Sequence, residues 1–322
     1  MWEVIVNLLI FLLGLTFLIY GANFFIQASV KMSLLFRLTP LFIGIIIVAF
    51  GTSLPELGVG VIAAVKNQKA IALGNIIGSN IANIALILGL CSIFHPLRVK
   101  KRIFSKELPL MLLSAVLLYL LSLDMVLSRI DGLVFIAFFI LFCIVSFSGA
   151  KASIGGIQEL DDFKFNRLFS NVKSLPIIIF TAVVSLFFVL WGADLMVRSG
   201  VKMALIFNVS PWIVGITIFA IGTSLPELAA SLAASFRKVS SISIGNIIGS
   251  NIFNILLVLG IVALIRPITI DDAKVISFEM PALLIFSILI YIFMRTSFKI
   301  SRREGIFLLL SYLVFIIMLI VK

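Results

Sequence analysis

The feature that most constrains the fold is a long internal repeat. When the chain is shifted by 171 positions, its first half falls on its second half without a gap over about 80 residues. The string "GTSLPEL" stands at 51–57 and again at 222–228, and "GNIIGSNI" stands at 74–81 and again at 245–252. An apolar composition would align scattered Leu and Ile, but it would not align Gly, Pro, Asn, Ser and Glu at one offset. The repeat predicts that both halves share one architecture.

The composition places the chain in a membrane. Of its 322 residues, 62% are hydrophobic and 12% are charged, whereas a soluble domain has roughly 45–50% apolar and 25% charged residues. The apolar residues fall into runs of about 18 to 25, each long enough to cross a bilayer as a helix. We therefore predict an all-α polytopic membrane protein with ten transmembrane helices, at about 4–30, 38–65, 70–94, 107–124, 130–149, 175–200, 209–235, 241–265, 275–295 and 304–321.

The number of spans in each half sets their relative orientation. Five is an odd number, so the second half must enter the membrane from the opposite side, and the two halves form inverted repeats. Secondary transporters commonly have this plan, with the substrate site near the midplane where the repeats meet. The predicted units are a first repeat at 1–149 with its motif at 39–90, a cytoplasmic linker at 150–174, and a second repeat at 175–322 with its motif at 210–261.

The net charge of +11 could suggest a nucleic-acid partner in a soluble protein. Here 17 of the 25 basic residues lie in alternate loops, those that follow the odd-numbered spans. Such loops usually stay in the cytoplasm. We therefore expect both termini on the extracytoplasmic side, the lipid bilayer as the surrounding medium, and no nucleic acid.

Each copy of "GTSLPE" places a carboxylate inside an apolar run. A charge at the centre of a membrane helix costs roughly 2.5–3.5 kcal/mol on insertion scales, and such residues usually face the protein interior along an ion or proton path. This predicts functional roles for Glu56 and Glu227. Pro55 and Pro226 interrupt each helix, because proline donates no backbone hydrogen bond. The freed backbone oxygens must then be satisfied by an ion, by water or by a hydroxyl group.

Hydroxyl and amide side chains accompany the carboxylates. Thr52 and Ser53 precede Glu56 by four and three positions, so all three side chains point roughly the same way along a helix. The following span adds a polar stripe at every fourth position in each half, formed by Asn75, Ser79 and Asn83 and by Asn246, Ser250 and Asn254.

All of these ligand candidates offer oxygen, and no His or Cys cluster accompanies them. Oxygen ligands suit hard cations such as Ca²⁺, Na⁺ or Mg²⁺ and argue against Zn²⁺ or Cu⁺. Two ionised glutamates are balanced equally well by one divalent or by two monovalent cations. This equivalence allows different ions to compete for one site, which is what exchange requires.

At these residues the sequence resembles the cation/calcium antiporter superfamily, in particular its prokaryotic sodium/calcium exchanger-like members. The resemblance covers essentially the whole chain through the duplicated motifs "GTSLPE" and "GNIIGSNI". It implies that Ca²⁺ and Na⁺ bind between spans 2, 3, 7 and 8, that spans 1 and 6 slide to alternate access, and that the protein lies in the plasma (inner) membrane of a prokaryote. Matched residue by residue, it implies ligands at Thr52, Ser53, Glu56, Ser79, Asn83, Thr223, Ser224, Glu227, Ser250 and Asn254, and at the carbonyls of Ala49 and Ala220.

The sequence departs from the family at one position. Many relatives carry an aspartate where this chain has Asn254. An acid there is associated with potassium dependence in related exchangers, so its absence argues against potassium co-transport.

The residues favour a secondary antiporter that exchanges Ca²⁺ for Na⁺, with no enzymatic activity, no cofactor and no obligatory protein partner. A proton/calcium antiporter that uses the same two glutamates is the alternative. A cation channel is more remote, because channels usually build a pore from several subunits or from a re-entrant filter.

Overall fold

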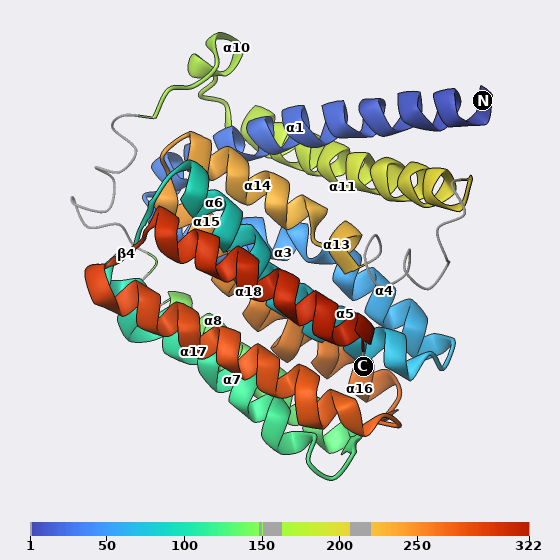
Figure 1. Cartoon of the computed structure of the whole chain (residues 1–322). Helices are drawn as coiled ribbons and strands as arrows, with labels where there is room; N and C mark the ends of the chain where they lie inside the picture. Colours follow the sequence, from blue (N-terminus) through green and yellow to red (C-terminus); the bar gives the residue numbers. More distant parts are fainter. Residues whose placement is uncertain (1, 148–149, 151–162, 207–219, 322) are drawn as a thin grey trace.

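The computed structural model describes residues 2–147, 150, 163–206 and 220–321, and these are almost entirely helical (Figure 1). Seven described helices are long and apolar enough to cross a membrane, or eight if one bent pair counts as a single span. The predicted span 209–235 begins at residues 209–219, which lie outside the described part. The chain is therefore a multi-span helical membrane protein, and the count of ten spans stays a prediction.

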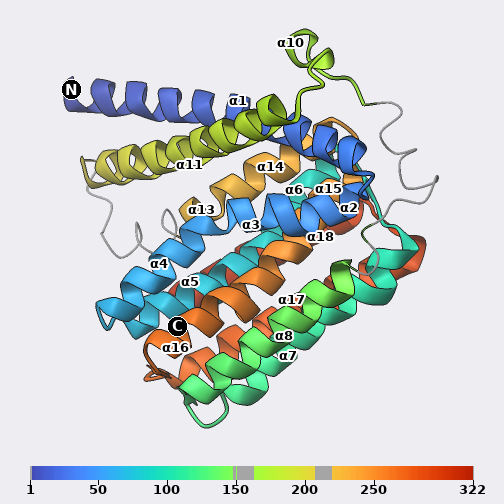
Figure 2. The ribbon, with the colours of Figure 1, turned by 180° about the vertical axis from the view of Figure 1, so that it is seen from behind.

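Helices α1 (Trp2–Phe36) and α11 (Leu175–Ile206) form an antiparallel pair along one face of the molecule (Figures 1 and 2). Two facing glycines allow the close approach of their backbones. A β-carbon on Gly14 would lie 2.7 Å from the Gly192 carbonyl oxygen, and one on Gly192 would lie 2.6 Å from the Gly14 carbonyl oxygen. Small residues at such positions are the usual means of packing membrane helices closely.

The first "GTSLPE" segment forms a broken helix in the middle of the molecule. Its two parts meet at Ser53 with a bend of 43°. Pro55 lies in the first turn of the second part, where its missing N–H would have no intrahelical partner in any case. The elements of the broken helix are α2 (Pro40–Ile43), the π-helical η1 (Gly44–Val48), α3 (Ala49–Thr52) and α4 (Leu54–Val65).

The second "GTSLPE" segment breaks in the same way. Helix α13 (Ala220–Thr223) ends at Ser224, and α14 (Leu225–Phe236) begins with Pro226 in its first turn. The residues that would extend α13 toward its N-terminus lie before the described range. Both motifs therefore place a glutamate in the first turn of the helix that follows the break.

Two long helices form the centre of the bundle, and most of their residues are buried. Each contains a π-helical segment, a wider turn that is frequent at functional sites. The first of these segments begins at Asn83 and the second contains Asn254. The two helices consist of α5 (Lys69–Ala82), η2 (Asn83–Ile87) and α6 (Leu88–Phe94), and of α15 (Ser240–Ile252), η6 (Phe253–Leu259) and α16 (Gly260–Ile265).

Helices α7, α8 and α17 lie on the side opposite to α1 and α11, and α18 lies beside the central helices (Figures 1 and 2). Helix α7 packs against α17, α8 against α16, and α18 against α6. Their bounds are η3 (Ile103–Glu107) with α7 (Leu108–Leu121), α8 (Arg129–Phe147), η7 (Val275–Glu279) with α17 (Met280–Ser297), and α18 (Arg302–Val321).

Four two-residue strands join the halves at the helix ends. Strand β1 (Leu97–Arg98) pairs with β4 (Lys299–Ile300), and β2 (Val126–Leu127) pairs with β3 (Ile268–Thr269), both antiparallel. The registers correspond: Leu97 faces Ile300 in one pair, and Ile268 faces Leu127 in the other. Each strand therefore pairs with a strand from the other half of the chain, and the two pairings have the same form.

The described part of the linker, from Phe163 onward, packs against α1. It contains the short helix α10 (Arg167–Ser170). Lys31 of α1 is 8% exposed, and its Nζ donates to the carbonyl oxygens of Ser170 at 2.9 Å and Val172 at 2.5 Å. Arg237, just after α14, donates to the carbonyl of Lys164 and to the side chain of Asn23 on α1. The linker thus connects α1 to the end of α14.

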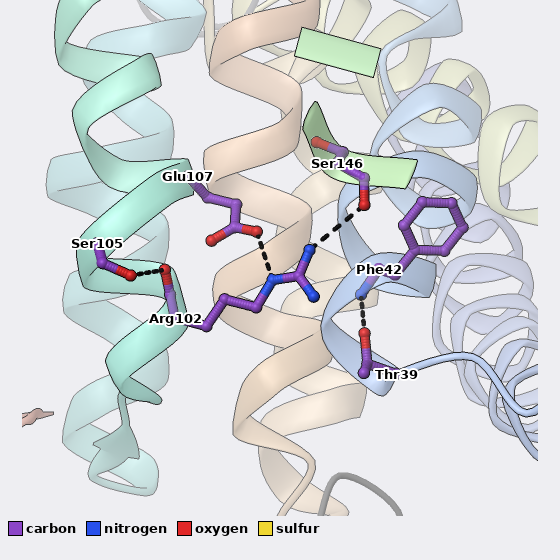
Figure 3. Close-up of polar contacts among 6 residues, drawn as sticks. All are labelled: Thr39, Phe42, Arg102, Ser105, Glu107 and Ser146. Atoms are coloured by element: carbon purple, nitrogen blue, oxygen red, sulfur yellow. Dashed lines mark hydrogen bonds and ion pairs between the residues drawn. The ribbon is translucent and has the colours of Figure 1, made fainter. Parts of the chain in front are cut away.

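A partly buried ion pair lies at the start of the α7 helix, and its arginine also bonds to the end of α8 (Figure 3). Arg102 Nε donates to Glu107 Oε1 at 3.0 Å, and its Nη2 donates to the carbonyl oxygen of Ser146 at 3.3 Å. The Glu107 side chain is 2% exposed. The guanidinium group therefore neutralises a buried carboxylate and satisfies a carbonyl near the C-terminal end of α8.

Replacing Arg102 by methionine should destabilise the fold, because it leaves the Glu107 carboxylate buried without its cation. We expect the free energy of unfolding to fall by about 1–3 kcal/mol, measured as a lower Tm of the purified protein. Lys101→Met, which removes an exposed neighbouring charge, is the matched control. Equal Tm values for the two variants would contradict this role for Arg102.

Candidate ion-binding site

The two helix breaks bring Glu56 and Glu227 into the middle of the bundle. Both side chains are 0% exposed. Each lies in the first turn of its helix, where the free backbone N–H groups and the helix dipole stabilise negative charge. The proline before each glutamate starts this new helix. The position of each carboxylate is thus a local consequence of its own motif.

Hydroxyl groups from both halves donate to these carboxylates. Ser79 Oγ donates to Glu56 Oε1 at 3.4 Å, and Ser250 Oγ donates to Glu227 Oε1 at 3.5 Å. Ser53, from the first half, donates to Glu227 Oε1 at 3.2 Å. The Glu227 carboxylate is therefore bound by residues of both repeats.

Two threonines make matching contacts across the repeats. Thr52 Oγ1 donates to Asn246 Oδ1 at 3.1 Å, and Thr223 Oγ1 donates to Asn75 Oδ1 at 3.3 Å. Thr223 Oγ1 also lies 3.3 Å from Ser79 Oγ. These bonds connect the two broken helices to the two central helices.

Four asparagines form a second cluster between the central helices. Asn83 Nδ2 donates to Asn251 Oδ1 at 3.0 Å, and Asn254 Nδ2 donates to Asn80 Oδ1 at 3.4 Å. Sequence reasoning missed Asn80 and Asn251, because they lie off the stripe at every fourth position. Their presence in both copies of "GNIIGSNI" was the signal that could have found them.

Four carboxylate and amide oxygen atoms at the candidate site are buried and have no hydrogen-bond partner within the described part of the chain. They are Oε2 of Glu56 and Glu227, and Oδ1 of Asn83 and Asn254. A buried acceptor without a donor is costly and needs an explanation such as an ion. Carboxylate and amide oxygens are ligands for Ca²⁺ and other hard cations. The described residues hold no group of three or more His, Cys, Asp or Glu, so such a site would depend on hydroxyl and amide oxygens as well.

The other predicted ligands lie in the same region. Ser53 and Ser224 are 3% and 2% exposed, and the Ser224 hydroxyl has no partner among the residues that the structure describes. The Ala49 carbonyl oxygen accepts from Ser53 N at 2.9 Å and lies 3.4 Å from Thr52 Oγ1. Ala220 is the first residue of α13, at the edge of the described range. The ligand roles of all twelve residues stay predictions.

Ser53 and Ser224 occupy equivalent positions but make different contacts, which allows a matched test. Ser53→Ala removes a bond to Glu227, whereas Ser224→Ala removes a hydroxyl without a described partner. We expect Ser53→Ala to reduce Ca²⁺ affinity more, by about fivefold, which corresponds to about 1 kcal/mol. Equilibrium ⁴⁵Ca²⁺ binding to the two purified variants measures this. A larger loss for Ser224→Ala would contradict it.

A cavity of about 610 Å³ reaches the site from the C-terminal half of α11. Its lining includes Thr223 and Pro226 at one end and Asp194, Arg198 and Lys202 of α11 at the other. Asp194 accepts from Arg198 Nε at 2.7 Å, and both side chains are largely exposed. Asp194 is thus exposed and lines an open cavity that also contacts the half-buried Thr223.

Comparison with known proteins agrees with this geometry. The sequence model of the sodium/calcium exchanger protein family matches residues 6–148 and 177–321. The chain belongs to the sodium/calcium exchanger family. The match covers both halves and both helix breaks. The family is one of exchangers and not of enzymes.

Individual members of the family are similar over nearly the whole chain. The sodium/calcium exchanger MaX1 of Methanosarcina acetivorans is 30% identical, covering 98% of each chain. The inner membrane protein YrbG of Escherichia coli is 36% identical, covering 96% of this chain and 95% of YrbG. A solved structure of the sodium-calcium exchanger NCX_Mj, soaked with zero Na⁺ and Ca²⁺, superposes with a TM-score of 0.84 at 34% identity, covering 98% of this chain and 99% of that chain. The resemblance stated from the motifs is confirmed.

Proposed function

We propose that this exchanger-family protein is a secondary antiporter that exchanges Ca²⁺ for Na⁺ by alternating access. The observation that carries the proposal is the pair of buried glutamates, Glu56 and Glu227, each at a helix break and each with one carboxylate oxygen that has no described partner. One Ca²⁺ or two Na⁺ would neutralise the pair. The ions are bound between the broken helices α3–α4 and α13–α14 and the central helices α5 and α15.

The proposed architecture is ten spans in two inverted repeats, 1–149 and 175–322, joined by a cytoplasmic linker at 150–174. The paired breaks at Ser53 and Ser224, and the matching registers of β1–β4 and β2–β3, support a two-fold relation between the halves. The loop charges favour extracytoplasmic termini. The protein is placed in the inner membrane of a prokaryote, in accord with YrbG.

The ligand set we propose is the carbonyls of Ala49 and Ala220 together with the side chains of Thr52, Ser53, Glu56, Ser79, Asn83, Thr223, Ser224, Glu227, Ser250 and Asn254. The burial of both glutamates and the four unpaired oxygens support it. The cavity along α11 supports access from the extracytoplasmic side, since a cytoplasmic linker puts the C-terminal end of α11 outside. An amide at Asn254 instead of an acid favours exchange without potassium.

The test is ⁴⁵Ca²⁺ uptake into proteoliposomes under imposed Na⁺, K⁺ and H⁺ gradients, one at a time. We expect saturable uptake driven by an outward Na⁺ gradient and not by K⁺. Uptake driven by a pH gradient in Na⁺-free vesicles would instead establish proton/calcium exchange through the same glutamates. Uptake without saturation or counterflow would indicate a channel.

A further inference from the structure

Both polar atoms of the Asn251 side-chain amide form hydrogen bonds. Its Oδ1 accepts from Asn83 Nδ2 at 3.0 Å. Its Nδ2 donates to the Asn80 carbonyl oxygen at 3.4 Å and to the Met111 sulfur at 3.7 Å. A carbonyl oxygen and a thioether sulfur can only accept hydrogen bonds. They therefore require Nδ2 on their side of Asn251, and Oδ1 on the side of Asn83.

This arrangement determines the orientation of Asn83. Because Asn251 presents an oxygen, Asn83 must present its Nδ2 to form the bond. The Asn83 Oδ1 then turns away and is buried without a partner among the described residues. An amide rotated by 180° would instead point two N–H donors at the same place, and donors repel a cation.

The equivalent asparagine of the second half is held less firmly. Asn254 Nδ2 donates to Asn80 Oδ1, but Asn80 Nδ2 has no partner in the described structure. When Pro109 at the start of α7 is aligned with Pro281 at the start of α17, Met111 corresponds to Leu283, whose side chain has no acceptor. Rotating the side-chain amides of both Asn80 and Asn254 by 180° would preserve a hydrogen bond between them. The direction in which the Asn254 oxygen points is therefore not determined in the same way.

We propose that Asn251 is a positioning residue for cation binding, which holds the Asn83 oxygen toward the site across the interface of the two repeats. The inference rests on the proposed function, since it assumes that Asn83 is a ligand. Asn251 itself does not contact the ion. Its partner lies in the other half of the chain, so docking of the two repeats is what prepares the Asn83 ligand.

The experiment measures KM and Vmax of Na⁺-driven Ca²⁺ uptake for Asn251→Ala in two backgrounds, the natural chain and Asn83→Asp. In the natural chain we expect KM for Ca²⁺ to rise about tenfold, the equivalent of about 1.4 kcal/mol, with Vmax within about twofold. In the Asn83→Asp background, Asn251→Ala should leave KM unchanged or lower it, because a carboxylate presents an oxygen in either orientation.

Three controls separate positioning from folding. Ser287→Ala removes a buried hydroxyl group that donates to the Leu283 carbonyl oxygen of its own helix. This variant should leave KM unchanged. The Tm of each purified variant, with and without Ca²⁺, reports folding and binding separately. If Asn251→Ala does not yield folded protein, Asn251→Ser is judged by the same KM criteria.

An unchanged KM in the natural chain, or a tenfold rise in both backgrounds, would overturn the positioning role. Failure of the proposed function gives a different result. In that case the unmodified protein itself shows neither Ca²⁺-dependent stabilisation nor Na⁺-driven uptake.

Discussion

Replacing Glu56 by glutamine is expected to reduce Na⁺-driven Ca²⁺ uptake by about 100-fold or more. Glutamine keeps the size of the side chain but removes one of the two negative charges of a fully buried site. The attraction between two unit charges about 4 Å apart is about 4 kcal/mol at an effective dielectric constant of about 20. A loss of that size exceeds a factor of 100 in affinity. The measurement is ⁴⁵Ca²⁺ uptake per folded protein in proteoliposomes. We expect a loss of the same size for Glu227→Gln.

The chain offers a matched control for this substitution. Glu107 is also a buried carboxylate on a bundle helix, but its partner is Arg102, and it lies outside the hydrogen-bond network of the site. Glu107→Gln should lower stability while leaving uptake per folded protein within about threefold. Full uptake by Glu56→Gln, or an equal loss with Glu107→Gln, would show that Glu56 does not carry ion binding.

Replacing Gly249 by alanine is expected to destabilise the protein by about 3 kcal/mol or more. A β-carbon at Gly249 would lie 2.5 Å from the Ile45 carbonyl oxygen and 2.7 Å from the Ala49 β-carbon. These are parts of η1 and α3, so the strain cannot be relieved by turning a flexible side chain. Overpacking of a buried interface typically costs about 1–3 kcal/mol, and more when the backbone must move. The expected result is a much lower Tm, or loss of the monodisperse peak in size-exclusion chromatography.

Gly58→Ala provides the contrast. Gly58 is exposed on α4, and a β-carbon there would meet no described atom within 4 Å. Alanine is favoured over glycine in a helix by up to about 1 kcal/mol, so this variant should be as stable as the unmodified protein or slightly more. If Gly249→Ala has the same Tm as Gly58→Ala, close approach at Gly249 does not support the interface between α15 and the first broken helix.

The features that sequence reasoning predicted correctly depend on residues near one another in the chain. The break at Ser53 follows from Pro55, and the burial of Glu56 follows from the apolar run around it.

The features that sequence reasoning missed depend on the docking of the two halves. The two copies of the motif predict equal roles for Ser53 and Ser224. Of these two serines, Ser53 bonds a carboxylate of the other half, whereas the Ser224 hydroxyl has no partner among the described residues. The bond between Asn251 and Asn83 was not predicted, because the two residues lie in different halves of the chain. No local spacing rule relates such a pair.

The sequence by itself determined the internal repeat, the helix breaks and the burial of the two glutamates, because proline geometry and the cost of burying a charge act within a few residues. The tertiary structure alone decided which oxygen atoms stay unpaired, and on which side of the amide of Asn83 the oxygen lies. These depend on hydrogen bonds between side chains 140 to 194 positions apart, and such bonds exist only once the two halves have packed together.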